Sequence, residues 1–207
     1  MRRLTRTPLL FTAVALAAVL STAAAAAATN GNSTAAAAAA RAPTLLAFAA
    51  NSTSTTTSAN FISVKGRGSR GSRIIVRRAN PRSLPSNDIW VVKPNRNGSF
   101  TLRAFYNQAL CLNVPASRYR SGIALNVWTC TGGANQKFLI TESPYSPQYS
   151  ALRPYPAASL CLAVSRGIAA GHPVIEFGCN SARYENWALG VVTVSGGAAM
   201  SAPIPRL

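Results

Sequence analysis

Few side chains in this sequence could carry out catalysis. The chain has one histidine, His172, and four acids. The acids are Asp88, Glu142, Glu176 and Glu185. The sequence lacks a Ser-His-Asp order with supporting groups and a Gly-rich phosphate loop. The acids are also too scattered to predict the facing carboxylate pair of a glycosidase. We therefore predict that the protein is not an enzyme and uses no cofactor.

The stretch LNVWTCTGGANQKF, residues 125–138, offers a different chemistry. Trp128 stands two residues before Cys130, and Asn135 and Gln136 lie shortly before an aromatic residue. Tryptophan combines a large apolar surface with one polar N–H, and amide side chains both donate and accept hydrogen bonds. The stretch is either a binding site or one unit of a repeating fold whose polar residues hold a turn.

Positive charge is abundant and unevenly distributed. The formal net charge is +17, and ten basic residues between Phe61 and Asn107 accompany one acid, Asp88. The ten are Lys65, Arg67, Arg70, Arg73, Arg77, Arg78, Arg82, Lys93, Arg96 and Arg103. This block is a candidate surface for anionic polymers such as acidic glycans, teichoic acids or nucleic acid. The alternative is a basic secreted protein that its charge keeps soluble.

The first 59 residues have the composition of processing and linker segments. Residues 1–28 follow the order of basic, apolar and small residues that is typical of a secretory signal peptide. An uncleaved membrane anchor is the alternative, because the apolar run approaches the ~20 residues that span a bilayer. Residues 29–59 are rich in Ala, Ser, Thr and Asn, which predicts a disordered linker. We expect a secreted protein, with no transmembrane span in its mature form.

A unit of about fifty residues occurs three times after the linker. NFISV, LCLNV and LCLAV align Val64, Val114 and Val164. In each unit a glycine follows, three positions before an apolar residue, and a three-residue motif ends the unit. The glycines are Gly71, Gly122 and Gly171; the end motifs are Asp88-Ile89-Trp90, Gln136-Lys137-Phe138 and Glu185-Asn186-Trp187. We predict that the aromatic residue of each end motif packs in the core.

The four cysteines follow the register of the repeat. Cys111 and Cys130 fall in the second unit, and Cys161 and Cys179 fall in the third. The first unit lacks both members, which favours pairing within units, Cys111–Cys130 and Cys161–Cys179. Four cysteines and one histidine at wide spacing do not resemble zinc ligands, so we predict no metal.

The local patterns predict strands throughout the repeats. Short runs rich in β-branched and aromatic residues alternate with Gly, Pro, Asn and Ser, and Asn97-Gly98 is a hairpin signal. Three units of about four strands predict a closed threefold all-β barrel, since one unit cannot bury a core alone.

These landmarks resemble the ricin B-type lectin domains, a β-trefoil family with Q-x-W repeats. The motif C-L-x-V, then G, then W-x-C, then N-Q-x-[FW] is almost complete in residues 111–138, looser in 161–187 and eroded in 61–90. The resemblance implies a β-trefoil domain over residues 60–195, with a C-terminal tail at 196–207. It also implies an extracellular protein that binds carbohydrate, either galactose-type or another glycan. We expect this protein to be a monomer.

The resemblance places a sugar site in the second unit. There a sugar ring would stack on Trp128, while Asn126, Asn135 and Gln136 would bond its hydroxyls. Asn113 stands where the family has a carboxylate, and an amide lacks the charge-assisted bond that a carboxylate makes. Gln136 also has a structural interpretation, in which it bonds the backbone of its own turn.

The other two units depart further from the family pattern. The third keeps Phe177, Tyr184 and Glu185 as a weak second site, with Ala163 and Ile175 at the polar positions. The first has Ser63, Arg77, Asn87 and Asp88 at these places, and its arginine favours an anionic ligand. Two alternatives to a lectin follow: a binder of anionic polymers through the first unit, and a trefoil scaffold for a protein partner.

Overall fold

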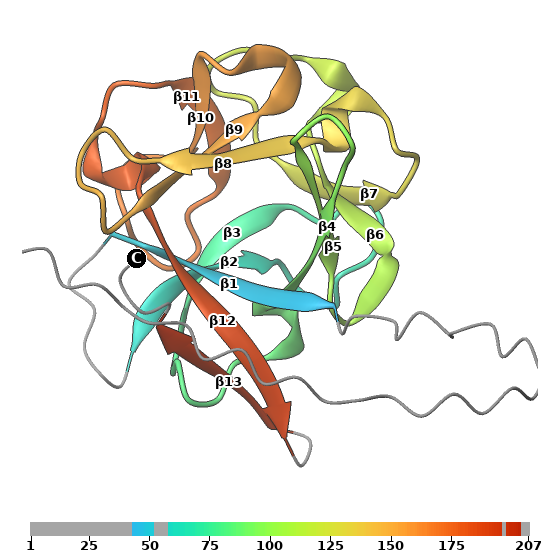
Figure 1. Ribbon diagram of the computed structural model, residues 1–207, viewed down its shortest axis with the longest axis vertical. Coiled ribbons are helices and arrows are strands. Elements are labelled where there is room, and N and C mark those ends of the chain that lie inside the picture. Colours follow the sequence, from blue (N-terminus) through green and yellow to red (C-terminus); the bar gives the residue numbers. More distant parts are fainter. Residues whose placement is uncertain (1–42, 52–57, 196–197, 204–207) are drawn as a thin grey trace, which may run out of the picture. The chain divides into compact units, whose positions relative to one another are not determined.

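A computed structural model describes residues 43–51, 58–195 and 198–203 (Figure 1). This part of the chain consists of strands and short 3-10 helices. The strands are β1 (Thr44–Ala50), β2 (Ala59–Val64), β3 (Ile74–Ala79), β4 (Trp90–Pro94), β5 (Phe100–Ala104), β6 (Asn107–Asn113), β7 (Asn126–Thr129), β8 (Phe138–Glu142), β9 (Ser150–Pro154), β10 (Leu160–Val164), β11 (Val174–Gly178), β12 (Trp187–Ser195) and β13 (Ala198–Pro203). The 3-10 helices are η1 (Ser86–Asp88), η2 (Pro115–Ser117), η3 (Ala134–Gln136), η4 (Tyr155–Ala157) and η5 (Arg183–Glu185). In this described portion, none of the helices has the length and hydropathy of a membrane span. The predicted signal peptide, residues 1–28, lies outside the described residues.

Six strands close into a barrel. β1 pairs with β4 and β12, β4 pairs with β5, β5 with β8, β8 with β9, and β9 with β12. Closure leaves these strands without a free edge, which removes the unpaired backbone groups of an open sheet. β13 lies along the outside of β12 (Figure 1).

Three hairpins complete the fold, one from each repeat. β2 pairs with β3, β6 with β7 and β10 with β11. Each repeat therefore contributes four strands: β1–β4, β5–β8 and β9–β12. The fold is a β-trefoil, as the threefold repeat predicts.

The core contains the side chains that the repeat aligned. Trp90, Phe138 and Trp187 are fully buried, and so are the matched residues of the inner strands. The indole N–H groups of Trp90 and Trp187 donate to the carbonyls of Ile62 and Leu162, at 3.3 and 2.9 Å. A buried indole needs such a partner. The prediction that the end-motif aromatics are core residues is confirmed.

The predicted linker is wrong for residues 44–50, because these form β1 (Figure 1). Its partners are β12 along Leu46–Ala50 and β4 along Thr44–Leu46. Phe48 is fully buried, and Leu46 and Ala50 join the same core cluster. The prediction is also wrong for Ala59, the first residue of β2. Linker residues 29–42 and 52–57 lie outside the described part. The domain therefore begins by Thr44, and β1 is an integral strand of the barrel.

Both predicted disulfides are present. Cys111–Cys130 and Cys161–Cys179 each tie the first strand of a hairpin, β6 or β10, to the residue that follows the second strand, with Cα atoms 5.1 Å apart. In repeat one, Phe61 takes the place of the first cysteine and is buried in a second cluster with Leu84 and Ile89. An apolar cluster thus replaces the covalent link in that repeat.

The repeat glycines join each hairpin to the next one. The N–H of Gly71 donates to the carbonyl of Val127 in repeat two, at 2.8 Å. In the same way, the N–H of Gly122 donates to the backbone carbonyl of Glu176 in repeat three. The N–H of Gly171 donates to the backbone carbonyl of Val76 in repeat one. All three glycines have φ between 86° and 90°, a region that other residues avoid. Each repeat therefore places one loop against the hairpin of its neighbour.

Candidate functional site

The hairpin β6–β7 positions the predicted site residues of repeat two. Its register sets Asn113 opposite Asn126 and Cys111 opposite Trp128. Because side chains alternate along a strand, Asn126 and Trp128 project from the same face. η3 then brings Asn135 to this face from the other side, where its backbone carbonyl accepts from the N–H of Val114.

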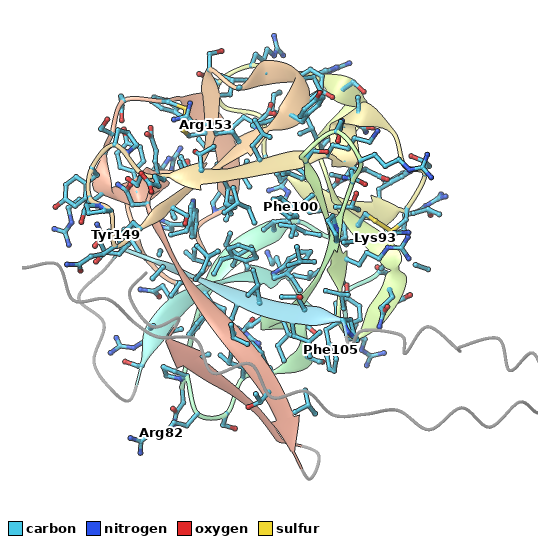
Figure 2. The ribbon with its side chains drawn as sticks, viewed as in Figure 1. Arg82, Lys93, Phe100, Phe105, Tyr149 and Arg153 are labelled. Atoms are coloured by element: carbon cyan, nitrogen blue, oxygen red, sulfur yellow. A yellow bond between two sulfur atoms is a disulfide. The ribbon has the colours of Figure 1, made fainter. Side chains whose placement is uncertain are left out.

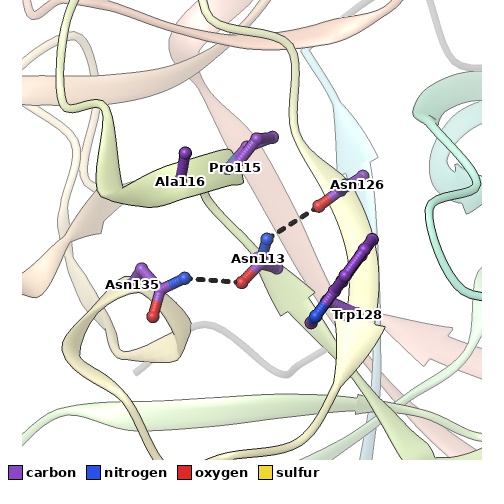
Figure 3. A pocket seen from close by; sticks show the side chains of 6 residues that line it. All are labelled: Asn113, Pro115, Ala116, Asn126, Trp128 and Asn135. Atoms are coloured by element: carbon purple, nitrogen blue, oxygen red, sulfur yellow. Dashed lines mark hydrogen bonds between the residues drawn. The ribbon is translucent and has the colours of Figure 1, made fainter.

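These side chains line one pocket of about 440 Å³ (Figure 3). The lining residues are Asn113, Pro115, Ala116, Asn126, Trp128 and Asn135. Figure 3 shows the Trp128 ring standing at one side of the pocket, with Asn113 between the other two asparagines. Trp128 is 39% exposed, which is unusual for so large an apolar side chain. The pocket has the size of a small-molecule site.

An amide network fixes the floor of the pocket. The Nδ2 atom of Asn113 donates to Oδ1 of Asn126, and Nδ2 of Asn135 donates to Oδ1 of Asn113, both at 2.8 Å (Figure 3). Asn113 is nearly buried. Neither bond uses the NH₂ group of Asn126 or the side-chain carbonyl oxygen of Asn135, so the network leaves one donor on Asn126 and one acceptor on Asn135 outside it.

Gln136 lies beneath the pocket and does not line it. Its side chain is buried, donates to the carbonyl of Thr129 at 2.8 Å and accepts from the N–H of Thr131 at 2.8 Å. A weaker bond of 3.4 Å reaches Asn113. The sequence assignment of Gln136 to sugar contact is therefore a mistake; the residue holds its turn, as the structural interpretation predicted.

Three neighbours of the pocket were missed by the sequence reasoning. Pro115 and Ala116 form its rim, and Ala116 has φ of 53°, in the left-handed region. The guanidinium of Arg70, from repeat one, lies 4.5 Å from the centre of the Trp128 ring. That distance is within the range of a cation–π interaction. The repeat glycine at position 71 was the available clue, because it marks the loop that reaches the next repeat.

The third repeat places Phe177 and Tyr184 together, but without the amides. Their ring centres are 6.1 Å apart in an edge-to-face arrangement. Phe177 is exposed, while Glu185 is buried and accepts from the N–H of Asn180 at 3.0 Å. Glu185 thus matches Gln136 in role as well as position. Of the three residues predicted for a weak second site, Phe177 and Tyr184 meet at the surface and Glu185 lies below.

In the first repeat, Arg77 is engaged by a carboxylate. Its Nε and Nη2 atoms donate to Oδ1 of Asp88 at 3.1 and 2.8 Å. Asp88 is fully buried; this burial raises the pKa of its carboxyl, and the paired Arg77 opposes the rise. Asn87 donates to the carbonyls of Val64 and Gly66. Arg77 is therefore a poor candidate for the anion contact predicted from the sequence.

Burial of the acids makes the surface strongly basic. Asp88, Glu176 and Glu185 are buried, which leaves Glu142 as the exposed acid. Burial raises the pKa of Glu176 to about 7, and the N–H of Arg120 donates to its carboxylate at 3.3 Å. Within the described residues, His, Cys, Asp and Glu side chains form no group of three that could hold a metal ion.

Residues 86–177 match the family model described as the ricin-type beta-trefoil lectin domain-like family. Among curated proteins, none matches the chain in sequence.

Solved structures share the fold at low sequence identity. ThreeFoil, a designed threefold symmetric protein, is 19% identical with a TM-score of 0.60, over 70% of this chain and 96% of that chain. The Macrolepiota procera ricin B-like lectin, solved in complex with lactose, is 14% identical with a TM-score of 0.52, over 67% and 97%. An exo-beta-1,3-galactanase from Clostridium thermocellum is 16% identical with a TM-score of 0.61, over 73% of this chain and 30% of the enzyme.

Proposed function

We propose that this protein, whose residues 86–177 belong to the ricin-type β-trefoil lectin-like family, is a secreted carbohydrate-binding protein without catalytic activity. Its sugar site is the pocket of repeat two. The observation that carries the proposal is that an exposed Trp128 lines one pocket with Asn126 and Asn135, whose amides keep one donor and one acceptor outside the Asn113 network.

This combination suits a pyranose. The C–H face of the sugar ring is apolar and packs on an indole face, whereas hydroxyl groups need polar partners with fixed orientation. Asn113 holds the amides of Asn126 and Asn135 before a ligand arrives, so little side-chain entropy is lost on binding. The lactose complex of the Macrolepiota procera lectin supports a sugar as the ligand class for this fold.

A glycan array tests the proposal, with wild type and Trp128→Ala measured at about 100 mM and about 500 mM NaCl. We expect Trp128→Ala to lose at least about tenfold in affinity, because it removes the stacking surface. Tyr145→Ala is the control, since it truncates an exposed aromatic side chain outside both predicted sites and should leave that binding unchanged. Failure of the wild type to bind any glycan would refute the proposal.

A second candidate function is the binding of anionic polymers through dispersed charge. It is favoured by the burial of three acids and by a second hollow, lined by Arg118, Tyr119 and Arg120. The basic side chains are available to a polymer at the surface; Arg82, for example, projects away from the ribbon (Figure 2). This function predicts binding that weakens steeply with salt and survives Trp128→Ala. The same array separates the two candidates.

A further inference from the structure

We propose that the pocket of repeat two selects acidic sugars, which carry a carboxylate or a sulfate on the pyranose ring. Arg70 and Arg73 of repeat one supply the selectivity. The inference rests on the proposed function, because it concerns the ligand class of the same pocket.

The loop of repeat one that carries these arginines pairs with the outer edge of β7. Val127 accepts from the N–H of Gly71 at 2.8 Å and donates to the carbonyl of Ser72 at 2.9 Å. Arg73 forms an antiparallel bridge with Asn126. The other edge of β7 pairs with β6, which carries Asn113. The site residues of β7 therefore lie between the amide network on one side and the arginine loop on the other.

Each arginine adjoins a residue that lines the pocket, Arg70 at Trp128 and Arg73 at Asn126. The guanidinium of Arg70 lies 4.5 Å from the centre of the Trp128 ring. Arg73 is exposed, and directly opposed residues of an antiparallel pair project from the same face of the sheet. Asn126 faces the pocket, so Arg73 projects from the pocket's side of the hairpin.

The threefold symmetry of the fold provides an internal comparison. In repeat two, Ser121 precedes the repeat glycine and Ala124 stands two positions after it. This loop lies along β11, the strand that carries Phe177. In repeat three the equivalent residues are Ala170 and Pro173, next to repeat one. The trefoil backbone therefore does not require arginine at either place. The charged loop coincides with the one hairpin that has an exposed tryptophan and pocket-facing amides.

The pocket itself carries no negative charge. Its six lining residues are uncharged, and Asn113 occupies the place that the family resemblance gives to a carboxylate. A carboxylate there would repel an acidic sugar, and an amide does not. Two cations without a counter-charge in the lining produce a positive potential, which favours an anionic ligand over a neutral one of the same shape.

Titration calorimetry with matched methyl glycosides tests this inference. The probes are galactose, galacturonic acid and galactose 6-sulfate, together with glucose and glucuronic acid, as methyl glycosides. Arg70→Gln/Arg73→Gln removes both charges and leaves a planar amide beside Trp128. Arg82→Gln/Arg96→Gln is the control, since it removes the same number of charges from exposed positions outside the pocket.

For the wild type we expect an acidic sugar to bind at least about tenfold more tightly than its neutral partner, the advantage of a charged hydrogen bond. Arg70→Gln/Arg73→Gln should bring this ratio to within about twofold of unity and remove most of the salt dependence. The control variant should keep the ratio. Whichever acid binds, uronate or sulfate, identifies the source of the negative charge.

The outcomes are separable from those of the proposed function. Equal affinities for acidic and neutral sugars, or an equal loss of both in Arg70→Gln/Arg73→Gln, would overturn the inference while a Trp128-dependent sugar site remained. Acidic selectivity that the control variant abolishes equally would assign it to net charge and also overturn the inference. A wild type that binds none of the probes and no glycan on the array would overturn both.

Discussion

The side-chain amide of Asn135 donates to Oδ1 of Asn113 across 2.8 Å, linking residues 22 positions apart. The same oxygen accepts a longer bond from Gln136. The Asn113 amide cannot turn over without losing these bonds, so its Nδ2 atom stays directed at Asn126. One buried asparagine thus sets the orientation of two amides that line the pocket.

Asn113→Asp should reverse the preference of the pocket. A carboxylate cannot donate to Oδ1 of Asn126, so the Asn126 amide has to turn, and negative charge enters the floor. We expect affinity for acidic methyl glycosides to fall at least about tenfold, and neutral glycosides to gain from the charge-assisted bond. Calorimetry measures both; Asn113→Ala, which has no orienting group, should weaken both sugar classes. Unchanged acidic binding in Asn113→Asp would contradict the role given to Asn113.

Removal of either disulfide should lower the stability of the fold, but only one of the two removals should also weaken glycan binding. Replacing Cys111 and Cys130 together by Ala, or Cys161 and Cys179 together, should lower the free energy of unfolding by roughly 3 kcal/mol in each case. Denaturant unfolding measures this loss. The first pair lies on the hairpin that carries Trp128, so it alone should also weaken glycan binding. Equal binding by the two double variants would show that this hairpin is rigid without its disulfide.

Glu176 should make the stability of the fold depend on pH. Burial raises its pKa from the ordinary 4.5 to about 7. Between these values the folded protein holds a proton that the unfolded chain has lost. The contribution of Glu176 to the free energy of unfolding should therefore be highest below pH 4.5. It should fall as pH rises towards 7, by at most about 1.4 kcal/mol per pH unit.

Glu176→Gln is the variant that isolates this effect, because it keeps the shape of the side chain and cannot titrate. Urea unfolding of both proteins from pH 4.5 to pH 8 gives the difference in stability. The difference should grow in favour of the glutamine as pH rises. A difference that stays constant over this range would show that Glu176 is charged in the folded protein even at acidic pH.

Phe48→Ala tests the assignment of β1 to the barrel. Phe48 is fully buried, and truncation of such a side chain costs about 3–5 kcal/mol. Val191→Ala on the partner strand is the control, because Val191 is exposed and its loss should cost less than about 0.5 kcal/mol. Wild-type stability of Phe48→Ala in thermal unfolding would contradict the assignment and show that residues 44–50 belong to the linker.

The repeat could be predicted because each unit buries the same positions. Val64, Val114 and Val164 align in sequence and are all buried in the core. β1 could not be predicted in this way. Its sequence TLLAFAA is apolar without alternation, follows an alanine-rich segment and is buried over most of its length. Such a run does not distinguish a strand by periodicity.

The site could be predicted in part. Trp128, Asn126 and Asn135 belong to the motif of one repeat, so the sequence placed them together. Arg70 belongs to a different repeat, and its contact with Trp128 arises from the cyclic pairing of repeat-glycine loops with neighbouring hairpins. Whether Gln136 lies in the pocket or under it depends on how η3 turns, which residue types alone do not specify.

The pairing of each repeat-glycine loop with the next hairpin also limits what duplication of a single repeat can achieve. If the sequence of repeat two were copied into all three positions, the loop beside every Trp128 pocket would also come from repeat two. Ser121 and Ala124 would then stand at the places of Arg70 and Arg73. The three copies would keep their stacking surface and amides and lose the arginines. The proposed acidic-sugar site therefore needs two different repeats side by side, one with the tryptophan and amides and one with the arginine loop.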